Sequence, residues 1–267
     1  MASRLGGRVA VITGASSGIG AALAEALAAR GVVVVAGARR LDRLANLVST
    51  IESAGGRALA VGCDVTRETD VRALVMRALT TFGRLDIVVA NAGAGFYGTL
   101  DETTPEVMTG LMDVNFMGTF HAARAALPHF EQQRRGHLVI VSSIQGRRAI
   151  AFSSAYASTK FAQAGLAEAL RAEFAGTEIH VTSVFPVSTA TEFREAMRRD
   201  HGLTIEGHGP SQSSAAVAAA IVGAIERPRP EVYPYRLAKW LPVVSAVAPR
   251  FADRLMRRFG RRRAGSP

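Results

Sequence analysis

Short apolar runs alternate with amphipathic stretches over the first two thirds of the chain. Six runs of strand length are nearly continuous in Val, Ile, Leu and Ala, namely residues 8–13, 32–38, 58–63, 85–90, 137–142 and 179–185. Such runs are typical of strands covered on both faces, as in a parallel sheet. Between them lie helical patterns such as GIGAALAEALAARG, which ends at Gly31. The repeat predicts an α/β fold, a single-domain doubly wound parallel sheet with helices on both faces.

This alternation stops near residue 187. Residues 197–214 are polar and contain glycine, and we expect a mobile substrate lid over about 187–214. The apolar run 215–225 is too short to cross a bilayer and predicts a buried helix. Prolines favour an extended conformation for RPRPEVYP at 227–234. The pattern therefore predicts a domain over residues 1–234 and an extension over 235–267.

The extension is basic and amphipathic. Apolar residues recur on a helical stripe that Pro242 and Pro249 interrupt, namely Leu237, Leu241, Val244, Ala248, Phe251, Leu255 and Phe259. Residues 250–263 carry seven arginines and one aspartate. Three interpretations remain: packing against the domain or a partner subunit, which we favour, peripheral contact with an anionic membrane, or a disordered tail.

Charge and composition narrow the class of protein. Of the formal net charge of +10, a net +6 falls in residues 250–263, so no basic stripe runs through the predicted fold and nucleic-acid binding is not expected. The single cysteine, Cys63, excludes an internal disulfide. The six histidines share no metal-ligand spacing, and we predict no metal site. We expect a cytoplasmic protein, with peripheral membrane contact as the alternative.

A glycine-rich turn follows the first predicted strand and opens the first predicted helix. It reads TGASSGIG over residues 13–20. Glycines at 14, 18 and 20 allow a tight turn and close approach to a pyrophosphate, which the helix N-terminus would also attract. The predicted dinucleotide contacts here are Gly14, Ser16, Ser17, Gly18, Ile19 and Gly20.

Three further motifs stand at matching distances along the chain. NAG occupies 91–93, Ser143 precedes Tyr156 by thirteen residues, and Lys160 follows it by four. Together with TGASSGIG they resemble the short-chain dehydrogenase/reductase family over roughly residues 5–193. The resemblance implies a Rossmann-type domain, hydride transfer between a nicotinamide cofactor and a carbonyl or alcohol, a small-molecule substrate, and a homodimer or homotetramer.

The end of the second predicted strand bears on the choice of cofactor. It reads AGARR, with Ala38 where NAD-preferring relatives carry an aspartate. A ribose 2′-phosphate needs a cation instead, and Arg39 has the planar fork to clamp it, with Arg40 beside it. Ser17 departs from the pattern, since many NADP-preferring relatives place a second basic residue there. We predict NADP(H), with NAD(H) as the alternative.

The resemblance assigns further cofactor contacts by position. They are Asp64 and Val65 at the adenine, Asn91, Ala92 and Gly93 at the end of the fourth strand, and Pro186, Thr189 and Thr191 near the nicotinamide or pyrophosphate. A helix-capping role for Asp64 before Thr66 is nearly as well supported as the adenine contact. Val187 replaces the family's usual glycine, which puts the backbone path of this loop in question.

The predicted catalytic residues explain an unusual lysine. The chain holds 30 arginines and only two lysines, Lys160 and Lys239. Residues i and i+4 share a helix face, so Lys160 would lower the pKa of Tyr156, the proposed general acid or base, and hold the ribose hydroxyls. The resemblance implies that Ser143 binds the substrate oxygen and that Asn115 holds a water in a proton relay behind Lys160.

The substrate wall is predicted to be mostly apolar. Its candidates are Phe96, Ile144, Phe152, Val187 and Phe193, with Arg147 and Arg148 within reach. We predict an NADPH-dependent carbonyl reductase. The alternatives are an oxidative NAD-linked alcohol dehydrogenase of the same family and a catalytically silent NADP(H)-binding regulator.

Overall fold

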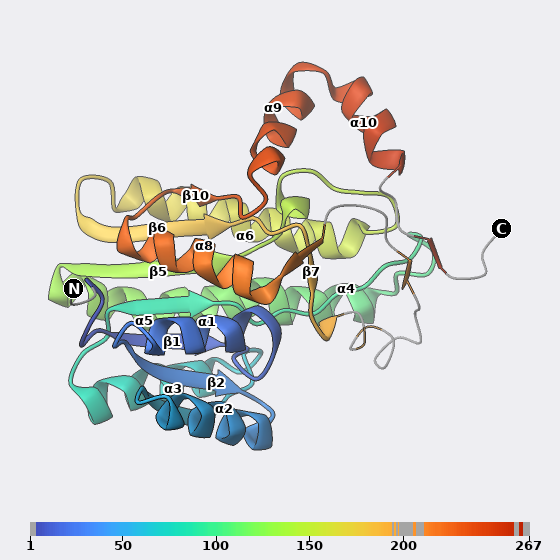
Figure 1. Ribbon diagram of the computed structural model, residues 1–267. Helices are drawn as coiled ribbons and strands as arrows, with labels where there is room; N and C mark the ends of the chain where they lie inside the picture. The colour runs from blue at the N-terminus through green and yellow to red at the C-terminus, as the bar shows by residue number, and fades with distance from the viewer. Residues whose placement is uncertain are drawn as a thin grey trace.

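A seven-stranded parallel sheet forms the centre of the molecule in the computed structural model, which describes residues 4–193, 195, 197, 205–206, 211–258 and 262–263 (Figure 1). The strands are β1 (Val9–Thr13), β2 (Val33–Ala38), β3 (Arg57–Gly62), β4 (Ile87–Ala90), β5 (Arg135–Val141), β6 (Glu178–Val184) and β10 (Glu231–Val232). Their order is β10-β6-β5-β4-β1-β2-β3, with every neighbouring pair parallel. The predicted doubly wound fold is confirmed.

Helices cover both faces of the sheet. Helices α1 (Gly18–Ala28), α2 (Leu41–Ser53) and α8 (Ser214–Glu226) share one apolar core with the strands. Helices α3 (Glu68–Phe82), α5 (Gly118–Gln133) and α6 (Ser154–Glu173) share the other. Helix α4 (Pro105–Leu111) and the π-helix η1 (Met112–Met117) lead into α5. The predicted buried helix at 215–225 is α8, whose start is capped by the Ser213 hydroxyl accepting from Ala216 N.

The seventh strand lies inside the segment that the prolines predicted to be only extended. Glu231 and Val232 of β10 pair with Ser183 and Val184 of β6. Proline cannot complete a ladder of hydrogen bonds in the middle of a sheet, which is consistent with this short strand lying at an edge. The pairing fixes the chain after α8 beside the carboxyl end of β6.

The strand order reverses between β1 and β4. The chain runs outward from β1 through β2 and β3, then returns to β4 and runs outward the other way through β5 and β6. Loops that leave the carboxyl ends of β1 and β4 therefore diverge, and ligands of open α/β sheets bind in that crevice.

The extension begins with the 3₁₀ helix η3 (Arg236–Lys239) and continues as two helices, α9 (Trp240–Val247) and α10 (Pro249–Arg258), which project from the body of the molecule (Figure 1). The predicted interruption at Pro242 is wrong, because that residue lies in the first turn of α9, where a missing N–H costs no hydrogen bond. The break falls at Pro249, the first residue of α10.

Part of the predicted lid can be followed. β7 (Ser188–Ala190) pairs in parallel with β9 (Ser211–Ser213), and β8 (Ile205–Glu206) pairs with β11 (Arg262–Arg263). Residues 194, 196, 198–204 and 207–210 of the lid, and 259–261 and 264–267 of the extension, lie outside the described residues. Within the described ranges, no helix has the length and apolar character to cross a membrane.

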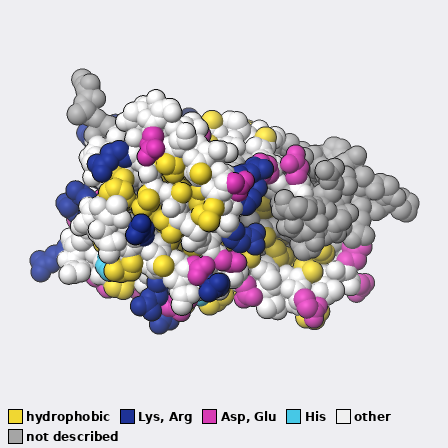
Figure 2. Space-filling model, turned by 90° about the horizontal axis from the view of Figure 1, so that it is seen from below, with side chains coloured by type: hydrophobic (Ala, Val, Ile, Leu, Met, Phe, Trp, Pro, Cys, Tyr) yellow, Lys and Arg dark blue, Asp and Glu magenta, His cyan; other side chains and the backbone are white. Residues whose placement is uncertain are grey.

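Charge is mixed on the face of the molecule seen from below. Figure 2 shows arginine and acidic side chains lying among one another around a central apolar patch. This face therefore offers a mixed surface and not a basic track for a nucleic-acid backbone.

Candidate active site

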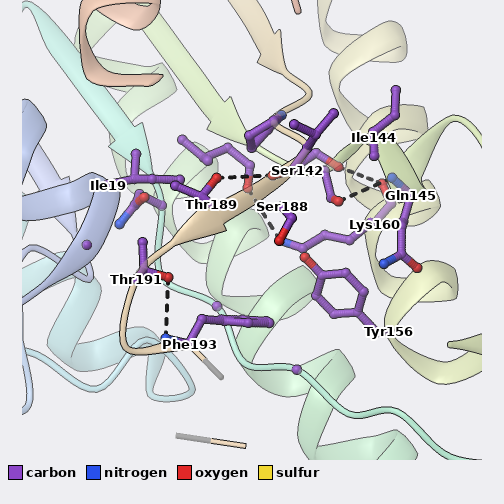
Figure 3. A pocket seen from close by; sticks show the side chains of 18 of the residues that line it. Ile19, Ser142, Ile144, Gln145, Tyr156, Lys160, Ser188, Thr189, Thr191 and Phe193 are labelled. Atoms are coloured by element: carbon purple, nitrogen blue, oxygen red, sulfur yellow. Dashed lines mark hydrogen bonds between the residues drawn. The ribbon is translucent and has the colours of Figure 1, made fainter. Parts of the chain in front are cut away.

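A cavity of about 770 Å³ opens at the carboxyl ends of the central strands (Figure 3). It collects nearly every residue that the sequence assigned to the site, from the glycine turn, the end of β2, the segments after β4 and β5, α6 and residues 186–193. Of the predicted catalytic and cofactor-binding residues, two, Gly20 and Asn115, do not line it. Both lie directly behind the lining, as described below.

The glycine turn has the geometry of a phosphate cradle. Gly14 and Gly18 have φ angles of +67° and +59°, in the left-handed region that favours glycine. A Cβ atom on Gly14 would lie 2.7 Å from the Cα of Ala92, and one on Gly20 would lie 2.4 Å from the carbonyl oxygen of Gly14. Helix α1 begins at Gly18 without a side-chain cap. The residues therefore fit a dinucleotide pyrophosphate set against backbone N–H groups.

Asn91 holds this turn in place. Its Nδ2 atom donates to the carbonyl oxygens of Thr13 (3.0 Å) and Gly14 (3.2 Å), and its backbone N donates to Thr13 Oγ1 (3.1 Å). The side chain thus ties the end of β4 to the end of β1. Asn91 therefore shapes the cradle, and it lines the cavity together with Ala92 and Gly93.

Arginines from the end of β2 bring positive charge to the cradle. The Arg40 guanidinium donates to Ser17 Oγ (2.8 Å) and to Ser16 Oγ (3.1 Å), and pairs with Glu192 at 3.0 Å. Arg43, in the first turn of α2, also pairs with Glu192. Arg39 lines the cavity and is exposed. β2 ends at Ala38, which has no acidic side chain. The two predicted arginines, Arg39 and Arg40, follow it directly and line the cavity beside the cradle.

Asp64 lies at the same end of the cavity. Its Oδ1 atom accepts from Thr66 N (3.1 Å) and Thr66 Oγ1 (2.9 Å), the capping arrangement that its position before Thr66 suggested. Burial acts to raise the pKa of this carboxyl, but the Thr66 hydrogen bonds together with Arg39 and Arg67 bring it below its usual value. Asp64 is therefore ionised, and it lines the cavity beside Val65.

The absence of a side chain at Gly146 allows the turn after Ser143 to pack closely against the helix that carries Tyr156. Ser143 follows β5, and its Oγ accepts from Gln145 N (3.2 Å) at the start of the 3₁₀ turn Ile144–Gly146. A Cβ on Gly146 would lie 2.6 Å from the carbonyl oxygen of Lys160, so α6 packs directly on this turn. Ser143, Tyr156 and Lys160 are each at most 8% exposed and line one cavity.

Lys160 is the buried cation of the site. Its Nζ atom lies 5.5 Å from the centre of the Tyr156 ring, and Figure 3 shows the two side chains together. The same atom donates to Gln163 Oε1 (3.0 Å) and to the Val141 carbonyl oxygen (3.4 Å). Burial lowers the pKa of the ammonium group from 10.5 to about 7. Because burial opposes the charge, the hydrogen bonds to Gln163 and to the Val141 carbonyl help to keep the lysine protonated.

Asn115 lies in the π-helix η1 and is fully buried. Its Oδ1 accepts from Ala94 N (2.8 Å), and its Nδ2 donates to Ala94 O (3.0 Å) and Thr159 Oγ1 (2.9 Å). Its backbone carbonyl oxygen accepts from Gln163 Nε2 (2.8 Å) and Thr119 Oγ1 (2.7 Å). Asn115 thus fixes the segment after NAG against α6, and its link to Lys160 runs through Gln163, a residue that the sequence analysis did not single out.

The segment after β6 closes the cofactor side of the cavity. Thr191 packs against the glycine turn, because a Cβ on Gly18 would lie 3.0 Å from its Cγ2 atom. Val187 N donates to Gln212 Oε1 (3.4 Å), and Thr189 Oγ1 donates to Val187 O (3.1 Å). Val187 is not among the described residues with positive φ, so the valine fits this backbone without left-handed strain.

The substrate wall differs from the prediction in two places. Ile144, Val187 and Phe193 line the cavity as expected. Phe96 does not, because it is buried against Leu111 and Ala155. Its neighbour Tyr97 lines the cavity instead, with its ring 6.1 Å from that of Tyr156.

Phe152 lies outside the wall because it is 42% exposed in a left-handed turn with φ +62°. The extension contributes further lining residues that the sequence analysis did not assign to the cavity. They are Tyr235, Leu237, Ala238, Trp240, Leu241, Val244, Phe251 and Met256. Helical periodicity marked several of them as apolar, but it carried no information on where the extension docks.

The two arginines predicted within reach of the substrate have separate places. Arg147 pairs with Glu168 and Glu231 and stacks over the ring of Phe185 at 4.6 Å, so it supports the sheet edge behind the site. Arg148 lines the cavity and pairs with Asp253 of α10. The positive charge of Arg148 is therefore balanced by the carboxylate of Asp253 in the extension.

Comparisons with known proteins agree with this geometry. The sequence model described as short chain dehydrogenase matches residues 8–202. The chain is 35% identical over 265 residues to the uncharacterized oxidoreductase YxnA of Bacillus subtilis, covering 96% of this chain and 73% of that one.

Two solved structures have the same fold. A short chain dehydrogenase/reductase from Burkholderia phymatum in complex with NAD superposes with a TM-score of 0.84 at 27% identity, covering 92% of this chain and 95% of that one. An alcohol dehydrogenase from Thermococcus sibiricus complexed with 5-hydroxy-NADP gives 0.75 at 28% identity, covering 85% and 95%.

Proposed function

The chain belongs to the short-chain dehydrogenase family and is an NAD(P)-dependent oxidoreductase, and on this premise we propose that it reduces the carbonyl group of an apolar substrate with NADPH. The cofactor supplies or accepts the hydride. The observation that carries the proposal is the convergence of Ser143, Tyr156 and Lys160 on one cavity with the glycine cradle at its other end.

Tyr156 acts as the general acid in reduction and as the general base in oxidation. Its phenol gives a proton to the substrate oxygen as that oxygen gains negative charge, and Ser143 Oγ stabilises the same oxygen with a hydrogen bond. The Lys160 ammonium lies 5.5 Å from the centre of the Tyr156 ring and, when charged, favours the phenolate form of the tyrosine. The apolar burial of the site strengthens each of these electrostatic contacts.

The preference for NADP(H) is proposed from the charge at the end of β2. Ala38 leaves no carboxylate to hydrogen-bond a ribose 2′-hydroxyl, and Arg40 is already oriented across Ser16 and Ser17. A 2′-phosphate would take the place of the Glu192 carboxylate as the partner of Arg40, with Arg39 as the second cation. Relatives bind either NAD or an NADP analogue, so the preference depends on these residues.

The proposed substrate is an apolar ketone, aldehyde or secondary alcohol. Ile144, Val187, Phe193, Trp240 and Val244 give the substrate side of the cavity an apolar lining. Its arginine, Arg148, is already paired with Asp253. This lining favours a substrate without a phosphate or carboxylate group.

We further propose that the chain works as a cytoplasmic homodimer or homotetramer, with peripheral membrane contact as the alternative use of its extension. Leu237, Trp240, Val243 and Val247 are each at least 49% exposed along η3 and α9, with Lys239 next to Trp240. Light scattering reports the number of subunits. Sedimentation with anionic vesicles, compared between the chain and its Trp240→Ser variant, reports membrane contact.

The experiment that tests the function follows oxidation of NADPH and of NADH with a panel of apolar ketones, aldehydes and diketones, and reduction of NADP and of NAD with the corresponding alcohols. Turnover with NADPH supports the proposal, and turnover confined to NAD with alcohols favours the oxidative alternative. Tight NADPH binding without turnover of the panel, in either direction, favours the regulatory alternative.

A further inference from the structure

A buried glutamine connects the catalytic lysine to the interior of the protein. Gln163 lies on α6, three residues after Lys160, and has no exposed surface. Its Oε1 atom accepts from Lys160 Nζ at 3.0 Å. Its Nε2 atom donates to the carbonyl oxygen of Asn115 at 2.8 Å and to Thr119 Oγ1 at 2.7 Å.

The chemistry of its neighbours fixes the orientation of this carboxamide. An ammonium group only donates and a backbone carbonyl only accepts. Oε1 must therefore face Lys160, and Nε2 must face Asn115. Thr119 Oγ1 donates to the Asn115 carbonyl at 2.7 Å and is left to accept from Gln163. Every polar atom of the network is satisfied in one arrangement, which makes a rigid unit.

The family resemblance sets a relay water between Asn115 and Lys160, and in this chain the Gln163 side chain bridges the same two residues. The Asn115 carbonyl already receives two hydrogen bonds, from Gln163 and Thr119, which match its two lone pairs. The Asn115 side chain is bonded to Ala94 and Thr159. A water between Asn115 and Lys160 could accept one proton and release another, whereas a neutral carboxamide held by both ends only orients its partners.

Resting on the proposed roles of Tyr156 and Lys160, we propose that Gln163 is a positioning residue that holds the lysine ammonium beside Tyr156 and closes the interior path for protons. When Tyr156 gives its proton to the substrate oxygen, the phenolate regains a proton from Lys160. Lys160 in turn takes one from solvent water that enters through the cavity. Proton exchange thus runs on the same side as the substrate and cofactor.

The lysine content of the chain makes a direct test practical. Lysine labelled with ¹⁵N at Nζ gives two signals, from buried Lys160 and from exposed Lys239, which serves as the internal reference. The full-length cofactor-free chain is titrated by NMR as the wild type and as Gln163→Met, which keeps the length of the side chain and removes its acceptor. Gln163→Met removes the hydrogen bond that the charged Lys160 ammonium donates. The titration midpoint of Lys160 should therefore fall by about one pH unit or more.

Activity gives the second readout. The alkaline limb of the pH profile of kcat/KM for NADPH-dependent reduction should move down with the Lys160 midpoint in Gln163→Met. Gln163→Glu keeps an acceptor and adds a negative charge, so it should raise the titration midpoint of Lys160. If the methionine variant does not fold, this upward shift tests the role of Gln163 in its place. Ala167→Val, an overfilled buried site on the same helix, controls for lost stability and should leave both midpoints in place.

The outcomes separate this inference from the proposed function. An unchanged Lys160 midpoint and an unchanged pH profile in Gln163→Met would overturn the role of Gln163, even if Tyr156→Phe is inactive. Full turnover in Tyr156→Phe would overturn the proposed function, whatever the glutamine variants do to the titration of Lys160.

Discussion

The Nη2 atom of Arg40 lies 2.8 Å from the Oγ atom of Ser17. This contact carries a cation from the end of β2 onto the glycine turn. The family resemblance sets a second basic residue at the position of Ser17 in many NADP-preferring members. Here the short side chain of Ser17 leaves room for the Arg40 guanidinium to lie over it. Arg40 therefore supplies the positive charge that a basic residue at position 17 would supply.

We expect Arg40→Ala to weaken NADPH binding roughly 10- to 100-fold, the effect of losing a charge-assisted contact with a phosphate. NADH binding should change little, because NADH has no 2′-phosphate. Fluorescence titration of both nucleotides measures the two dissociation constants. Arg39→Ala should show the same selectivity.

Arg43→Ala is the matched control for the arginine variants. Arg43 also pairs with Glu192 but does not line the cavity. Its removal should leave the ratio of the two dissociation constants unchanged. An unaltered ratio in both Arg39→Ala and Arg40→Ala would show that neither residue binds the phosphate.

Ser143→Ala should lower kcat by about 10²- to 10³-fold, the usual loss when one donor to a developing oxyanion is removed. NADPH binding should stay near that of the wild type, because the cradle is at the other end of the cavity. Steady-state kinetics together with nucleotide titration separate the two effects. A kcat within a few-fold of the wild type would exclude Ser143 as the oxyanion donor.

Gly146→Ala should destabilise the fold by about 1–3 kcal/mol, the typical cost of overpacking. The added Cβ would meet the Lys160 carbonyl oxygen at 2.6 Å and Ser142 Oγ at 2.7 Å. Gly165→Ala, on the exposed side of α6 with nothing within 4 Å, should instead stabilise by up to about 1 kcal/mol. Urea unfolding of the two variants compares them, and equal stabilities would contradict the close packing of α6 on the 3₁₀ turn.

Acid should destabilise the protein through His137. Burial, with His180 and Arg8 adding to it, lowers the pKa of His137 from 6.5 to about 3. The unfolded chain therefore binds a proton that the folded one excludes, and stability is full above pH 6.5 and is lost as the pH falls toward 3. His137→Phe should flatten this slope in unfolding curves between pH 7 and about 4. His129→Gln, a partly exposed histidine of α5, should leave the slope as it is.

The repeated apolar runs were enough to predict the sheet and its covering helices, because strands buried on both faces leave an unmistakable local pattern. The glycine turn, Ser143, Tyr156 and Lys160 could be placed in one site because their motifs resemble those of the short-chain dehydrogenase/reductase family, and the structure brings them to one cavity. The edge strand β10 could not, because two residues that bond to β6 carry no periodicity of their own.

The remaining differences come from contacts between distant segments. Whether Phe96 or Tyr97 faces the cavity depends on how the loop packs against Leu111, and the docking of α9 and α10 beside the cavity depends on tertiary contacts. The sequence analysis did not assign Gln163, a polar residue of helix α6. Its position between Lys160 and Asn115 could not be predicted, because the fold brings the Asn115 carbonyl to it from 48 residues away in sequence.

The central claim is that Tyr156 transfers the proton to a substrate bound beside NADPH. The most direct measurement compares NADPH oxidation by the wild type and by Tyr156→Phe on the same carbonyl panel, with NADPH affinity measured for both. We predict turnover in the wild type, loss of at least about 10²-fold in the variant, and nearly equal affinities. Turnover by Tyr156→Phe at the rate of the wild type would contradict the account.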